Sequence, residues 1–438
     1  MYKPVIRILK SRFYSQKDFY ISIFWGSLAG IFSQGLNFIT NVFLARTLGK
    51  GFGELVLYTS TNTMFQTFSL LGLNIIASVL VAENLNLNRI RLGQIIPNLY
   101  FIVSFLTIII SIIALMINEM TLFSFKFWTI HSNMFLIFII IWLIFSSLDV
   151  LQISILAGLG AFRDLAKVTL IKGILSIILI LTFVRFFGLE GAIVGYGLSF
   201  TVSFILNLHF LNNNRKKYGI IFNYNLDFKI IQRIFISSLP IFLASFALVP
   251  SQWGVNYILF NKVNGSLALT VFGIANQWMA LIQFFPLQIS KVVLPFLTKQ
   301  KDNIYDYKRT ERTGLIISIL IGIVLIALSF IFESQIIKIY KINYSVMKTP
   351  FRIMVLAALF SILNLYLGQN LIANGRSWLR MILDCLISIS LFISFIFFVS
   401  KTVIFALPLS YCVAFIVGSS LIIIIRRSNR FTKQQLIS

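Results

Sequence analysis

The stretch that decides the fold runs from Ser33 to Gly53 and reads SQGLNFITNVFLARTLGKGFG. It is mostly apolar, yet it carries three amide side chains, Gln34, Asn37 and Asn41, at spacings of three and four residues. On a helix these side chains share one face. Because such a face is costly against lipid, the pattern predicts a membrane-spanning helix whose amides turn toward a protein interior or a water-filled cavity.

A similar pattern occurs about half a chain later. Gln252 and Asn256 share a helical face, and Gly265 marks a turn 216 positions after the turn at Gly49. We interpret the two amide-bearing helices as facing each other across a substrate path.

The composition defines the class of protein around these helices. Of the 438 residues, 58% are hydrophobic and only 11% are charged, with a mean hydropathy of +0.92. This balance is typical of an all-α polytopic membrane protein. The apolar runs are continuous over helical lengths, whereas the strands of a β-barrel would alternate apolar and polar residues.

The formal net charge of +24 does not indicate a nucleic-acid partner. The basic residues cluster between apolar spans rather than in one patch with exposed aromatic residues. The positive-inside rule explains them and predicts that both termini are cytoplasmic. The basic groups expected in the cytoplasm include Arg89, Arg91, Arg163, Lys167, Arg215, Lys216, Lys217, Lys229, Arg233, Lys308, Arg309, Arg312, Arg376 and Arg380.

With roughly 20 apolar residues per crossing, the chain has about twelve predicted transmembrane helices. They lie near 20–45, 54–81, 95–117, 134–158, 168–187, 191–211, 236–260, 268–297, 313–333, 351–373, 381–400 and 403–425. The segment 212–235 is expected to be a basic linker with an amphipathic end on the membrane surface.

The chain also appears as two related halves. LAGLGAFRDLAK (156–167) in the first half corresponds to LIANGRSWLRMI (371–382) in the second. Each half has six predicted crossings, so we expect two parallel six-helix lobes, 1–218 and 219–438, with the substrate between them.

The remaining polar side chains within spans concentrate in two helices. The helix near 54–81 carries Tyr58, Asn62 and Gln66, and the helix near 268–297 carries Asn276, Gln277, Gln283 and Lys291. One interpretation is that single amides only join helices by hydrogen bonds. For the clustered set we favour a polar cavity lined by the first two helices of each half.

Ionic residues have competing interpretations. Lys291 either reaches the cavity or extends its amine to the interface. Arg46 either pairs with Glu54 at the cavity mouth or anchors the interface. Other charged residues are expected to be solvated or paired structurally, namely Asp149, Lys172, Arg352 and Asp384.

The sequence shows no sign of a metal or cofactor site. Cys385 and Cys412 both fall within predicted spans, and we find no metal-spaced Cys/His set and no Walker A motif. We therefore expect no metal and no cofactor.

The chain resembles the polysaccharide (O-antigen type) flippases of the MATE-like multidrug/oligosaccharidyl-lipid/polysaccharide exporter superfamily. The resemblance covers nearly the whole length. It rests on NVFLARTLGKGFGELVLY, on LAGLGAFRDLAK followed by GLEGAIVGYGLS, and on SLPIFLASF, VFGIANQW and PLQISKVVLP.

The resemblance implies a MATE-like fold and a flippase that moves undecaprenyl-diphosphate-linked oligosaccharide, an O-antigen or capsule repeat unit. Transport would run from the cytoplasmic to the periplasmic leaflet of the bacterial inner membrane by alternating access. Arg46 and Lys291 match positions where the family often carries cavity cations. Coupling to an H⁺ or Na⁺ gradient and association with polysaccharide polymerase and chain-length proteins are further expectations, and a nucleic-acid partner is not expected.

Two alternatives remain open at this stage. A drug or cation exporter of the same fold would carry an acidic residue deep in the first or seventh helix, and neither helix has one. An integral-membrane polymerase or glycosyltransferase would need a catalytic constellation in an outer loop. The outer loops offer Glu119, His131 and Glu333 without such a constellation.

Overall fold

The first half of the protein, in a computed structural model, is a set of long helices. The structure describes residues 25, 28, 30–87, 89–119, 133–225, 227–299, 304–373 and 376–435. The elements of the first half are a first helix over 30–48, α2 (Gly51–Leu70), α3 (Leu73–Leu87), α4 (Arg89–Glu119), α5 (Asn133–Gly158) and α6 (Phe162–Tyr218).

The second half continues in the same way. Its elements are α7 (Phe228–Phe260), α8 (Gly265–Lys299), α9 (Ile304–Ile331), α10 (Glu333–Ile339), α11 (Tyr344–Ala373), α12 (Ser377–Val399) and α13 (Val403–Gln435). No strand occurs among the described residues, so the prediction of an all-α polytopic protein is confirmed.

Eight helices of the described ranges are long and apolar enough to cross a membrane, or up to ten if each of two bent pairs is one span. One of the eight, α6, contains both predicted spans 168–187 and 191–211. The two parts are separated at Gly188, where φ is 56° and ψ is −129°. Only glycine adopts this backbone conformation readily, so the break follows from the residue type.

The structure corrects two sequence-based boundaries. The span predicted over 54–81 is two helices, α2 and α3, bent by 40° at a break over Leu71 and Gly72. The segment 212–235 is mostly helical rather than a linker, because α6 continues to Tyr218 and α7 begins at Phe228. The side chain of Asp227 caps α7 by accepting from the backbone N–H groups of Lys229 and Ile230.

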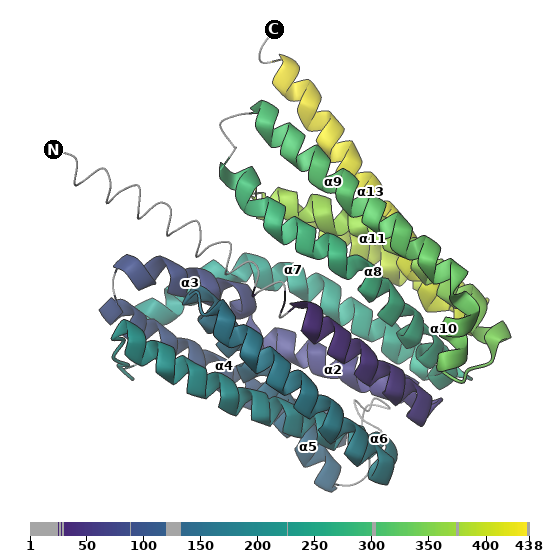
Figure 1. Ribbon diagram of the computed structural model, residues 1–438, viewed down its shortest axis with the longest axis horizontal. Helices are drawn as coiled ribbons and strands as arrows, with labels where there is room; N and C mark the ends of the chain where they lie inside the picture. Colours follow the sequence, from purple (N-terminus) through teal and green to yellow (C-terminus); the bar gives the residue numbers. More distant parts are fainter. Residues whose placement is uncertain are drawn as a thin grey trace.

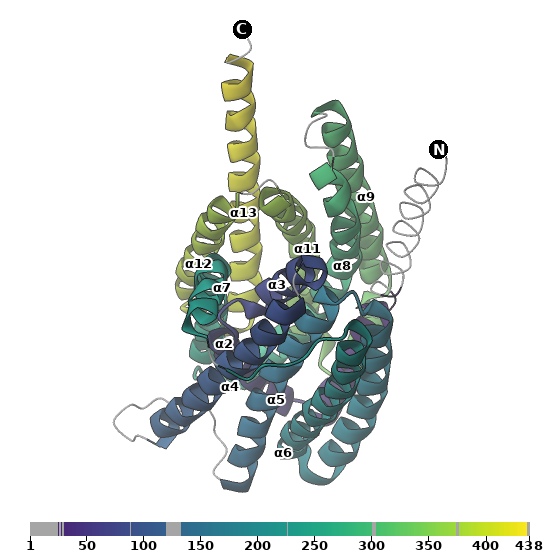
Figure 2. The same cartoon turned by 90° about the vertical axis from the view of Figure 1, so that its left-hand side faces the viewer.

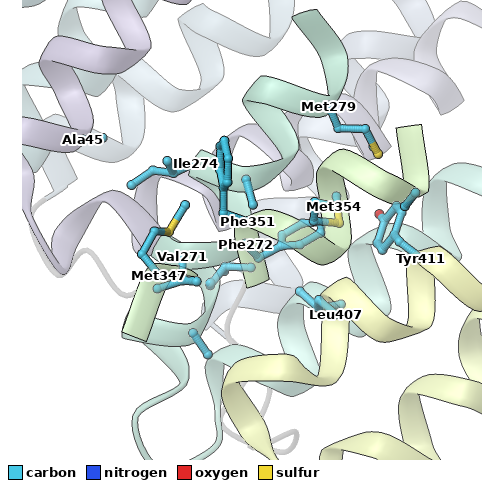
Figure 3. Close-up of a cluster of buried hydrophobic side chains, with 14 of the residues drawn as sticks. Ala45, Val271, Phe272, Ile274, Met279, Met347, Phe351, Met354, Leu407 and Tyr411 are labelled. Carbon is cyan, nitrogen blue, oxygen red and sulfur yellow. The ribbon is translucent and has the colours of Figure 1, made fainter. Parts of the chain in front are cut away.

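The main hydrophobic core joins the two halves. Leu44 and Ala45 of the first helix and Phe52 of α2 are buried in one cluster with residues of α8, α11 and α13. Figure 3 shows Ala45 at the edge of this cluster, beside Ile274 of α8. A separate core within the first half is built by α3, α4 and α5, with contributions from the start of α7.

The helices α8, α9, α11 and α13 of the second half lie close to the first half mainly at one end. Near α10, the helices of the second half approach the first helix and α2 (Figure 1). Toward the opposite end, α9 and α13 diverge from α4, α5 and α6, and the same divergence is seen after a 90° turn (Figure 2).

Candidate functional site

The junction of the halves is formed by the first helix, α2, α7 and α8. The indole N–H of Trp253 in α7 donates to the hydroxyl of Thr61 in α2 over 2.9 Å. Gln277 of α8 donates from Nε2 to the backbone oxygen of Phe38 in the first helix over 2.7 Å. The structure therefore brings together the four helices whose amides indicated a polar interior.

Gln277 is held in place from the second half. The hydroxyl of Tyr340, just after α10, donates to Gln277 Oε1 over 3.4 Å and accepts from Trp278 Nε1 over 3.0 Å. Burial raises the pKa of Tyr340, so its hydroxyl remains protonated and able to serve in both bonds. The ring of Trp278 also meets Phe38 edge to face, with centroids 5.1 Å apart.

The halves also approach each other closely at the turns before α2 and α8. The backbone N–H of Gly53 donates to Thr270 Oγ1 over 2.8 Å, and Ser266 Oγ donates to the backbone oxygen of Lys50 over 2.7 Å. A Cβ atom on Gly53 would lie 2.1 Å from the backbone oxygen of Ser266. We call the contact made by Lys50, Gly53, Ser266 and Thr270 the closed contact.

Three predicted site residues bond within their own half. Tyr58 donates to Glu54 over 3.0 Å, Asn62 donates to Ser146 of α5 over 3.3 Å, and Gln283 donates to Ser361 of α11. These contacts fit the interpretation that amides join helices, and a substrate role for the three residues stays a prediction.

Other predicted site residues keep part of their surface accessible. Asn41 donates to Asn37 over 3.2 Å, so both lie on one face of the first helix as expected. Asn37 and Arg46 are exposed. The half-buried members of the set are Gln34, Asn41, Gln66, Gln252, Asn276 and Gln277.

Within the described part of the chain, two of the predicted site residues are buried amides with an unsatisfied oxygen. They are Asn62 and Asn256, whose Oδ1 atoms have no hydrogen-bond partner although the residues are only 8% and 5% exposed. A buried acceptor without a partner costs free energy of folding. These two oxygens are therefore candidates to accept hydrogen bonds from sugar hydroxyls or water.

Lys291 lies in the last part of α8, but its side chain falls outside the described residues. Its proposed role therefore continues to rest on the sequence.

Ion pairs confirm the expectation that charged residues such as Asp149, Lys172 and Asp384 are paired structurally. Asp149 of α5 is 1% exposed and lies 2.6 Å from Lys172 Nζ of α6. It also accepts from Asn207 over 2.7 Å and from Ser203. In the second half, Arg380 pairs with Asp384 over 2.7 Å.

Sequence reasoning missed several of the side chains that join the halves. Thr61, Thr270 and Ser266 gave no signal, because hydroxyl side chains within helices commonly bond the carbonyl one turn back. Trp253 offered a weak signal, since a buried indole N–H needs an acceptor.

An apolar pocket lies away from this junction. It is a groove of about 620 Å³ between α12 and α13, and its lining residues are apolar or serine. Ile389, Ile393 and Phe397 are exposed along it. Such a surface suits lipid chains rather than a sugar or a diphosphate, so it does not replace the junction as the candidate site.

Comparison with solved structures defines the fold. The inward-facing conformation of a multidrug resistance MATE family transporter of the MOP superfamily matches with a TM-score of 0.70 and 15% identity, covering 91% of this chain and 96% of that one. The outward-facing conformation of such a transporter matches with a TM-score of 0.65 and 14% identity, covering 93% and 96%. The protein thus has the MATE-like transporter fold.

A third match is a MOP superfamily transporter from Pyrococcus furiosus, described as having a binding pocket of reverse polarity. Its TM-score is 0.67 at 14% identity, covering 92% of this chain and 95% of that one. A search of curated proteins finds no match. A family model described as polysaccharide biosynthesis protein matches residues 21–301. The chain belongs to this family.

Proposed function

We propose that the protein is a flippase that moves undecaprenyl-diphosphate-linked oligosaccharide from the cytoplasmic to the periplasmic leaflet of a bacterial inner membrane. Two lobes, 1–218 and 219–438, rock against each other by alternating access, and both termini are cytoplasmic. The observation that carries the proposal is membership of a polysaccharide biosynthesis family combined with a transporter fold. An H⁺ or Na⁺ gradient drives the cycle, and polymerase and chain-length proteins are its partners in the same pathway.

The chemistry of the junction supports a sugar-bearing substrate. Amide side chains and indole N–H groups offer donors and acceptors for sugar hydroxyls. The rings of Trp253 and Tyr257 stack with centroids 5.3 Å apart on the same helix, α7. Neither the first helix nor α7 contains an Asp or Glu residue, which speaks against the alternative of a drug or cation exporter.

A catalytic alternative finds less support. Of the outer-loop candidates, Glu333 is 4% exposed and is bonded to Arg352 over 2.8 Å. Its carboxylate also accepts from Tyr344 over 3.2 Å. These bonds give Glu333 a structural role, while His131 and the side chain of Glu119 lie outside the described residues.

Lys291 tests the diphosphate part of the proposal. An ammonium acts on phosphate as a point charge, so Lys291→Arg should retain most export and Lys291→Gln should lose most of it. A charge–phosphate contact contributes about 1.5–3 kcal/mol, or roughly ten- to hundredfold in binding. Surface polysaccharide in a flippase-deleted strain, at matched protein level, measures the effect. Normal export by Lys291→Gln would show that Lys291 is an interfacial anchor.

Topology sets the direction of transport. A cysteine at Lys50, whose backbone takes part in the closed contact but whose side chain is exposed, should react with a membrane-impermeant maleimide added from the periplasm. A cysteine at Lys216, near the end of α6, should react only after the membrane is opened. Both positions are exposed in the structure, so access depends on the side of the membrane alone. The reverse labelling pattern would overturn the orientation.

A further inference from the structure

A narrow cleft lies where α3, α4 and α7 meet. Its walls include Leu80, Ile95 and Ile230, which are all at most 8% exposed, and its polar residues are Asn84, Arg91 and Arg233. Two guanidinium groups from different helices therefore share one apolar-walled cleft. The free space is about 10 Å³, roughly that of one water molecule, so a ligand would bind across its rim rather than inside it.

The surrounding backbone fixes the two arginines relative to each other. The segment between α6 and α7 runs along α4, where the N–H of Asn223 donates to the backbone oxygen of Gly93 over 2.9 Å. Arg89 Nη1 donates to the backbone oxygen of Tyr218 over 3.1 Å. Ile234 of α7 is 2% exposed and packs in the core of the first half. The cleft is thus built by packing rather than by loose surface side chains.

The first part of α7 has the character of a helix at a membrane surface. Phe228–Leu239 is bent by 56° from the rest of α7. Phe228, Phe235 and Ile236 are 81%, 47% and 61% exposed, on the side opposite the buried Ile230 and Ile234. At 100° per residue, Lys229 and Arg233 fall on the flank between these two faces. Exposed aromatic residues beside a basic flank are typical of helices lying in the lipid headgroup region.

Charges around the cleft favour an anion. The nearby acidic residues are Glu83, which is exposed on α3, and Asp227, whose carboxylate accepts backbone N–H groups of α7. Arginine suits phosphate oxygens because its planar fork can donate two parallel hydrogen bonds. Apolar walls beneath the arginines would contact the glycerol and upper acyl region of the same molecule.

We propose that this cleft binds the phosphate of an anionic phospholipid headgroup from the leaflet on the basic side of the membrane, with Arg91 and Arg233 as its two anchors. Basic pockets between membrane helices are sites of this kind. The bound lipid would hold the first part of α7 against the first half. The lipid site does not depend on the identity of the proposed substrate.

Native mass spectrometry of the purified full chain in detergent tests the site. The protein is titrated with phosphatidylglycerol or with phosphatidylcholine of the same acyl chains. The wild-type protein should bind phosphatidylglycerol at least about tenfold more tightly than phosphatidylcholine. Arg91→Gln combined with Arg233→Gln should weaken that binding about thirtyfold, which is about 2 kcal/mol at about 1 kcal/mol per basic residue. The single variant Arg233→Gln changes an exposed side chain and leaves the core intact. Its affinity for phosphatidylglycerol should fall about fivefold.

The matched control is Arg309→Gln with Arg312→Gln, which removes two exposed charges from α9 in the other half. Its affinity for phosphatidylglycerol should stay within about twofold of the wild-type value. If this control lost as much affinity, the effect would be due to net charge alone and the proposal would be wrong. The proposal would also be wrong if the Arg91/Arg233 variant bound phosphatidylglycerol as tightly as the wild-type protein. If an equal concentration of inorganic phosphate displaced phosphatidylglycerol, the site would bind free phosphate rather than a lipid headgroup, and the proposal of a lipid site would be wrong.

Discussion

Replacing Gly53 by valine should abolish most polysaccharide export while leaving the protein in the membrane. A Cβ atom at this position would lie 2.1 Å from the backbone oxygen of Ser266 and 2.9 Å from the backbone nitrogen of Thr270. Backbone atoms at these distances cannot yield as a flexible side chain can, so the closed contact must open. Overpacking of this kind costs about 1–3 kcal/mol, which shifts the population of a closed state by roughly 5- to 150-fold.

The control for this variant is Gly51→Val, two residues earlier in the same turn of α2. A Cβ at Gly51 meets only Leu48 at 3.8 Å, an ordinary contact distance. Spin labels on the turns before α2 and α8 measure the distance between the halves, which should lengthen in Gly53→Val and remain unchanged in Gly51→Val. Normal export together with an unchanged distance in Gly53→Val would refute the idea that the closed contact forms during transport.

Asp149→Asn should lower the free energy of unfolding strongly, although the two side chains have nearly the same shape. The carboxylate is almost fully buried and pairs with Lys172, whose ammonium also lies 4.0 Å from the centroid of the Phe200 ring. Removing one member of a buried pair leaves the other charge uncompensated and costs about 3–5 kcal/mol. The free energy of unfolding in mixed micelles, followed by circular dichroism, should fall by this amount.

The exposed Glu83→Gln variant changes the net charge equally and should unfold like wild type. Combining Asp149→Asn with Lys172→Met removes the unpaired charge and should recover part of the loss. If Asp149→Asn alone were as stable as Glu83→Gln, the pair would contribute nothing and the two helices would be held by apolar packing.

The sequence predicts the helices well where an apolar run ends at a turn. The predicted span 134–158 is found as Asn133–Gly158, and 381–400 is found as Ser377–Val399. Bends within apolar runs are harder to predict, because hydropathy does not report backbone direction. The break after α2 and the bend within α7 were therefore missed.

Prediction of the candidate site from the sequence is limited in a similar way. Amide spacing predicts which residues share a face of a helix, but it does not fix how that helix is rotated against its neighbours. Successive residues differ by about 100°, so Asn62 faces Ser146 within its own half while the adjacent Thr61 meets Trp253 across the junction. Only tertiary packing decides between these directions.

The proposed flippase activity is tested most directly in reconstituted liposomes that contain undecaprenyl-diphosphate-linked oligosaccharide. An impermeant glycosidase added outside cleaves only the oligosaccharides exposed on the outer leaflet. With wild-type protein, the cleaved fraction should rise above the level of protein-free vesicles toward completion, and Gly53→Val should stay near the protein-free level. A cleaved fraction with wild-type protein equal to that of empty vesicles, under an imposed H⁺ or Na⁺ gradient, would contradict the proposal that this protein translocates lipid-linked oligosaccharide.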